Sequence, residues 1–216
     1  MSDDLIRQLV LDLRPVKRLT NPARQAAYLA LPVALLTVAS AWLAGVRADF
    51  VLKFCEPAYL AETAVVLALF VMAIFAAFSS GVPGVRLRSI LWPLALVASS
   101  WLILVVARYL ALPAVFSLPS GIACVRRTLL LGVGPATALV IALRRTAPLE
   151  AGTSGALVMT SAGAVAILGT RALCGKDDGL HALLWHVLPL AVFALLGLLL
   201  GRVWFSRSSS LPSVRP

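Results

Sequence analysis

Five side chains in this sequence have the chemistry to bind a soft metal ion or to react with an oxidant: three cysteines and two histidines. Cys174, His181 and His186 fall within thirteen residues, in the stretch that joins the last two apolar runs. Soft metals prefer sulfur and imidazole ligands, and oxidants attack the thiolate form of cysteine. No CxxC, CxxxC or HExxH motif is present, so spacing alone identifies no metal or redox centre.

Cys124 lies beside Arg126 and Arg127 at the predicted start of an apolar helix. Cationic neighbours and the positive end of a helix dipole favour a thiolate, so we expect Cys124 to be more reactive than Cys174, which ends the next apolar run. If these two helices are neighbours, the two sulfurs can form a disulfide or share a metal ion with the histidines. The alternative is that both cysteines only fill space in helix contacts.

The composition predicts an integral membrane protein, because 61% of the 216 residues are apolar and only 13% are charged. The net charge of +10 does not indicate nucleic-acid binding, since the basic residues lie between the apolar runs, as determinants of membrane topology do. Each run is close to the ~20 residues that cross a bilayer. The predicted fold is all-α, a bundle of six membrane-spanning helices at about 26–46, 58–79, 90–110, 122–143, 153–173 and 183–204.

The basic residues also predict the orientation of the bundle. With a cytoplasmic N-terminus, twelve of the 19 Lys and Arg residues lie on the inner side and seven on the outer side. This places both termini in the cytoplasm. All five cysteines and histidines, Cys55 included, then fall on the outer side. The chain divides into an N-terminal segment (1–24), the membrane domain (25–205) and a tail (206–216), which is expected to be disordered.

The N-terminal segment has the pattern of a short amphipathic helix. Ser2, Asp3 and Asp4 suit its first turn, and Pro15 ends it. A helix of about three turns is marginal alone in water, so we expect it to fold against something, either the membrane surface or a cytosolic partner. Its apolar face comprises Leu5, Ile6, Leu9, Val10 and Leu13.

Several polar residues lie near the outer ends of the predicted spans. His186 is about one turn inside the membrane, where an ionisable group is a functional candidate. Glu62 has an equivalent depth, so we expect it to pair with His186 or with an outer arginine. Trp185 is expected to anchor its helix at the interface. Asp177 and Asp178 are expected to form a solvated turn.

The connectors are too short for a catalytic domain, and no phosphate-binding loop or nucleophile–base arrangement is present, so we predict that the chain is not an enzyme. Two alternatives remain open. A small transporter or metal permease usually carries charged groups near the bilayer midplane, and the centres of these six runs carry none. A membrane thiol oxidoreductase normally needs a CxxC pair.

The chain opens with the pattern Asp4-Leu-Ile-x-x-Leu9-x-x-Asp12-x-x-Pro15-Val16-x-x-Leu19. This opening resembles that of the NrsF family of bacterial inner-membrane anti-sigma factors. The resemblance extends over nearly the whole chain. It includes Cys124 at the start of the fourth span, and Cys174 followed by Asp177 and the pair Trp185-His186. The family usually has proline after the second cysteine and often histidine before it, where this chain has Gly175 and Leu173.

The resemblance implies a membrane anti-sigma factor that binds an extracytoplasmic-function sigma factor and contacts no nucleic acid directly. Heavy-metal or oxidative stress in the periplasm, read through the paired cysteines, would release the sigma factor. No obligatory cofactor is expected, only a transient soft metal ion as a signal. The sensing residues would be Cys124, Cys174, His186 and His181, supported by Arg126, Arg127, Asp177 and Trp185. The sigma-binding residues would be Asp4, Leu5, Ile6, Leu9, Asp12, Leu13, Pro15 and Val16.

Overall fold

A computed structural model describes residues 7, 10, 21–111, 113, 116–146, 148 and 150–204. The predicted N-terminal helix and the C-terminal tail therefore lie outside the described residues, except for Arg7 and Val10, which are helical and exposed.

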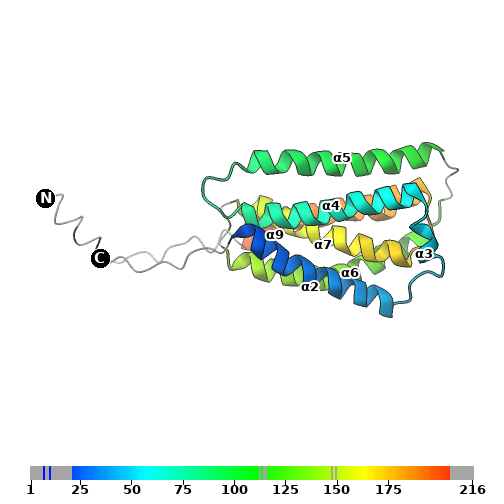
Figure 1. Ribbon diagram of the computed structural model, residues 1–216, viewed down its shortest axis with the longest axis horizontal. Helices are drawn as coiled ribbons and strands as arrows, with labels where there is room; N and C mark the ends of the chain where they lie inside the picture. The colour runs from blue at the N-terminus through cyan, green and yellow to red at the C-terminus, as the bar shows by residue number, and fades with distance from the viewer. Residues whose placement is uncertain are drawn as a thin grey trace.

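Six long helices form the bundle, which confirms the predicted all-α fold with six apolar spans (Figure 1). The last span is continuous through α8 (Gly179–Ala182), the π-helical segment η1 (Leu183–Val187) and α9 (Leu188–Trp204). A short helix, α3 (Phe50–Lys53), lies between the first two spans. The other five are α2 (Pro22–Leu43), α4 (Pro57–Ser79), α5 (Leu87–Ala111), α6 (Leu118–Arg144) and α7 (Ala151–Leu173).

The helices begin a few residues earlier than the apolar runs predict. The clearest case is α6, which begins at Leu118 instead of the predicted 122. Proline occupies the first turn of α2, α4 and α6, where its missing N–H costs nothing. Hydropathy alone misses these polar and proline-containing first turns.

The core of the bundle is α7, which packs against α2, α4, α6 and α9. Sixteen of its residues are buried, compared with four in α2. α7 and α9 approach each other closely, and a side chain on Gly155 would overlap the backbone of Gly197. By contrast, α5 lies along the edge of the bundle beside α4 (Figure 1).

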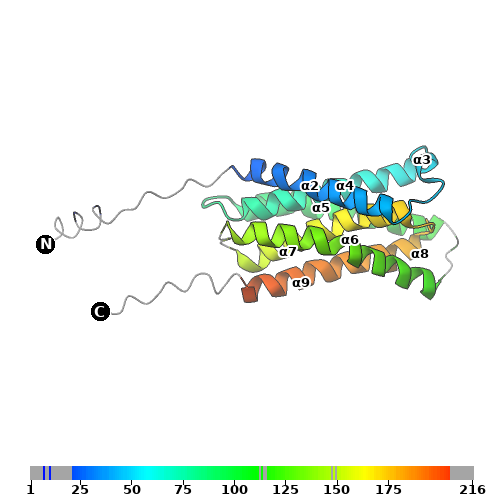
Figure 2. The same cartoon turned by 90° about the horizontal axis from the view of Figure 1, so that it is seen from below.

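The arginines mark two levels about one hydrocarbon thickness apart. Arg88 and Arg108 are twenty residues apart in α5, and Arg126 and Arg144 are eighteen apart in α6. At 1.5 Å per residue these separations are about 30 and 27 Å, close to the ~30 Å core of a bilayer. α3 and α8 lie at one end of the bundle, and α2 begins and α9 ends at the other (Figure 2).

Candidate metal and redox site

Four of the predicted sensing residues come together at the end of the bundle where α8 lies. Cys124 comes from α6, Cys174 from the segment after α7, His181 from α8 and His186 from η1. One potential ligand atom from each lies within 4.8 Å of the other three. The four residues are between 2% and 4% exposed. They form a compact, buried group of two sulfurs and two imidazoles.

The sulfur and nitrogen atoms of this group lie close to one another. The two sulfur atoms are 3.0 Å apart. Nε2 of His181 is 3.4 Å from the Sγ atoms of both Cys124 and Cys174. The rings of His181 and His186 have centroids 5.5 Å apart. Nδ1 of His186 is buried without a hydrogen-bond partner, which is costly for a polar atom.

The π-helical segment explains how both histidines face the sulfurs. Residues five apart in an α-helix point about 140° away from each other, because each residue turns the helix by about 100°. His181 and His186 are five apart, and the wider turn of η1 brings them to the same side. Such single π turns often occur at functional sites. The sequence pattern of two histidines does not indicate this turn.

Asp178 and Asp177 are not the solvated turn that we predicted. Asp178 is the N-cap of α8, and its Oδ1 accepts a hydrogen bond from the backbone N–H of His181 at 2.8 Å. Asp177 is half-buried and bridges Arg47, at 3.0 Å, and Lys53, at 2.9 Å. Burial alone would raise the pKa of the Asp177 carboxyl, but the hydrogen bonds from Arg47 and Lys53 outweigh it and hold that pKa below its ordinary value.

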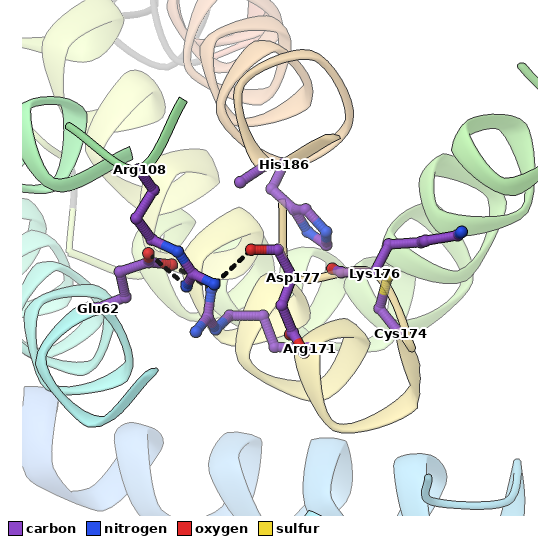
Figure 3. Close-up of a pocket in the computed structure, with 8 residues that line it drawn as sticks. Glu62, Arg108, Arg171, Cys174, Lys176, Asp177 and His186 are labelled. Carbon is purple, nitrogen blue, oxygen red and sulfur yellow. Dashed lines mark hydrogen bonds and ion pairs between the residues drawn. The ribbon is translucent and has the colours of Figure 1, made fainter. Parts of the chain in front are cut away.

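Glu62 pairs with two arginines, which is one of the two alternatives that we predicted for it. Its carboxylate, in a residue only 1% exposed, accepts from Arg108 at 2.8 Å and from Arg171 at 2.6 Å. Figure 3 shows the guanidinium groups of Arg108 and Arg171 next to the Glu62 carboxylate. A buried carboxylate needs such partners to offset its desolvation. This triad of Glu62, Arg108 and Arg171 connects α4, α5 and α7 beside the sulfur site. A cavity of about 10 Å³ lies between the triad and the residues Cys174 and His186, and it has room for about one water molecule.

The contacts of Cys174 favour its thiolate form, whereas the sequence led us to expect the more reactive thiol at Cys124. The pKa of Cys174 is lowered because its sulfur accepts from the Cys124 thiol and then from His181 and His186. Cys124 is the seventh residue of α6, and the dipole effect is largely confined to the first turn of a helix. Its basic neighbours are also directed elsewhere: Arg126 is exposed, and Arg127 donates to the Leu173 carbonyl at 3.2 Å.

Trp185 packs at the edge of the site, and Cys55 lies outside it. The Trp185 ring packs directly against Gly121, where a side chain would overlap it, and lies 6.3 Å from the Phe116 ring. Trp185 thus closes the outer contact between η1 and α6. Cys55 is exposed in the turn between α3 and α4 and is outside the group of four ligands.

Two thiolates and two imidazoles at these distances suit a tetrahedral soft or borderline metal ion such as Zn²⁺ or Cd²⁺. The unpartnered His186 nitrogen fits this interpretation, since a disulfide needs no histidine. The adjacent sulfurs also suit disulfide formation. The ligands that would hold a metal ion are therefore Cys124, Cys174, His181 and His186.

Sequence reasoning missed Arg47, Lys53, Arg108 and Arg171, which surround the site. The sequence analysis used these four residues only in the total of basic residues on the outer side. Their one signal was position, since all four lie at the outer ends of spans or in the first outer connector.

Comparison with known protein families gives one match. The family model NrsF, described as negative regulator of sigma F, matches residues 9–206, nearly the whole chain. No curated protein and no solved structure matches this chain.

Proposed function

Because the chain belongs to the NrsF family of negative regulators of a sigma factor, we propose that it is a membrane anti-sigma factor for a sigma factor of the extracytoplasmic-function class. It lies in the bacterial inner membrane with both termini in the cytoplasm. The excess of basic residues on the terminal side of the bundle supports this orientation.

The N-terminal segment holds the sigma factor. Its apolar residues Leu5, Ile6, Leu9 and Leu13, with Pro15 and Val16, supply a helix face of the kind that docks in a groove on a partner protein. α2 begins at Pro22, six residues after Val16, so in the sequence the docking residues are followed closely by a spanning helix.

The signal enters at the opposite end of the bundle, where Cys124, Cys174, His181 and His186 meet. A soft metal ion would bind these four ligands, and both thiols would give up their protons. Alternatively, a two-electron oxidant such as hydrogen peroxide would join the two thiols as a disulfide and be reduced to two water molecules. Either reaction changes the relative positions of α6 and the end of α7.

Release follows from thermodynamic linkage. If the metal-bound or oxidised form binds the sigma factor less tightly than the resting form, the signal shifts the population toward the sigma-free state. The observation that carries this proposal is the buried cluster of four ligands, located at the end of the bundle opposite the start of α2 (Figure 2).

A double substitution tests the input. Cys124→Ser with Cys174→Ser removes both sulfurs with little change in volume, so a sigma-dependent reporter should stay repressed when cells are exposed to Cd²⁺ or peroxide. Cys55→Ser is the matched control, because Cys55 is exposed and outside the cluster, and it should respond like the unmodified protein. A normal response from the double variant would rule out the thiol sensor.

A further inference from the structure

The segment that carries Cys174 is tied to the first outer connector by Arg47. The last carbonyls of a helix have no donors within the helix. At the end of α7, the Ala172 carbonyl accepts from the backbone N–H of Arg47 at 3.0 Å, and the Cys174 carbonyl accepts from its guanidinium at 2.6 Å. The same guanidinium bonds both carboxylate oxygens of Asp177 at 3.0 Å. Arg47 thus caps α7 from another part of the chain.

Two further arginines bind neighbouring carbonyls of this segment. Arg127 of α6 donates to the Leu173 carbonyl, and Arg108 of α5 donates to the Asp177 carbonyl. Arg127 and Arg108 lie within long helices, which hold their backbones in place. Arg47 differs, because it lies in the connector between α2 and α3, four residues after the end of α2 at Leu43.

α2 is lightly held by the rest of the bundle. It buries only Ala26, Val33, Thr37 and Ala41, whereas α7 buries sixteen residues. Displacing a helix with few buried contacts costs less than displacing a central one. A displacement at the end of α7 should therefore move α2 more readily than it moves α7 itself.

Both input reactions must move Cys174. Cys124 is held within α6, but Cys174 lies in a non-helical segment between α7 and α8. The sulfurs, now 3.0 Å apart, must approach to about 2.05 Å in a disulfide. Around a tetrahedral ion with metal–sulfur bonds of about 2.3 Å they must separate to about 3.8 Å. Either displacement reaches the Cys174 carbonyl, which Arg47 holds.

We propose that Arg47 connects the sulfur site to α2, so that a change at Cys174 repositions the helix that follows the docking segment. This inference rests on the proposed function for its biological meaning. The connection itself can be measured without a sigma factor.

The test compares two variants of the full-length protein in nanodiscs, with Cd²⁺ as the probe. Arg47→Gln removes the guanidinium and its charge, and Arg47→Lys retains the charge without the two-pronged guanidinium. Both variants keep the backbone N–H that bonds the Ala172 carbonyl. Lys53→Gln is the matched control, because Lys53 also binds Asp177 but makes no bond to the end of α7. Thiolate-to-Cd²⁺ charge-transfer absorbance reports binding. Hydrogen–deuterium exchange of residues 21–30 reports the start of α2, and that of residues 44–53 reports the connector after α2 together with α3.

We expect Cd²⁺ to change the exchange of these peptides in the unmodified protein and in Lys53→Gln. In Arg47→Gln the Cd²⁺-dependent change should fall by at least about fivefold, the lower end of typical coupling factors, while Cd²⁺ affinity stays within about threefold. Arg47→Lys should be intermediate.

An undiminished exchange response in Arg47→Gln would overturn the proposal. So would loss of Cd²⁺ binding in both Arg47 variants, which would make Arg47 part of the site itself. The reporter assay distinguishes this failure from that of the proposed function. A reporter that responds to Cd²⁺ while α2 exchange stays unchanged would leave the anti-sigma proposal standing and remove Arg47 from it.

Discussion

The two ends of α7 are attached to the bundle by different kinds of contact. At the inner end, Gly155 meets the backbone of Gly197, and a side chain on Gly201 of α9 would overlap the Ala151 carbonyl. At the outer end, the carbonyls of the terminal turn and of the Cys174 segment accept from arginines on separate elements, among them Arg47.

This difference indicates which part of the bundle can move. Close backbone packing leaves no room for rearrangement, so α7 and α9 form a fixed frame. Charged hydrogen bonds are directional and can exchange partners when the acceptor moves. The outer end of α7 therefore combines a reactive site with breakable connections, while the inner end keeps the helices in register.

The largest expected effect comes from removing the output side of this arrangement. Deleting residues 1–19 should turn the sigma-dependent genes on constitutively, with no further response to Cd²⁺, because the docking segment is gone while all six spans remain. A reporter assay combined with membrane fractionation measures both properties. Unchanged repression would show that the sigma factor binds elsewhere.

The outer charge network should be the most sensitive to a single substitution. Glu62→Ala would leave Arg108 and Arg171 without their shared carboxylate, and breaking such a buried pair costs about 3–5 kcal/mol. Glu56→Ala removes an exposed partner of Lys53 and should cost less than about 1 kcal/mol. Unfolding in detergent compares the two variants, and equal losses of stability would contradict the buried triad.

The inner frame should tolerate less bulk than the outer loop. Gly155→Val places a side chain against the backbone of α9 and should destabilise the fold by about 1–3 kcal/mol or more. Gly175→Ala is the matched control, since open space surrounds Gly175. If both substitutions lower the unfolding temperature equally, the close contact between α7 and α9 is wrong.

The smallest expected effect is a pH dependence from Asp177. Because Arg47 and Lys53 lower its folded-state pKa, Asp177 stabilises the fold fully above its unfolded pKa of about 3.9, and this contribution is lost as the pH falls through the folded value. Asp177→Asn should therefore cost about 1 kcal/mol near pH 7 and show a shallower loss of stability below pH 4. Parallel acid-unfolding curves for the two proteins would argue against the bridge.

Hydropathy and local spacing predicted the spans and placed the cysteines and histidines at one end of the bundle. Both predictions depend only on residues that are neighbours in the sequence. The meeting of Cys124 with Cys174 needed only the assumption that α6 and α7 are adjacent. The π turn that aligns His181 with His186 left no trace in the apolar pattern. Arg47 could not be found either, since its partner Cys174 lies 127 residues away. The apolar run of α6 also gave no sign that the helix begins at Leu118, which places Cys124 beyond its first turn.

The most direct test of communication between the two ends is the Cd²⁺ affinity of the full-length protein in nanodiscs, measured with and without its bound sigma factor. Linkage requires the sigma factor to weaken Cd²⁺ binding by the same factor by which Cd²⁺ weakens sigma binding, and we expect that factor to be at least about fivefold. Identical Cd²⁺ affinities in the two states would contradict the coupling.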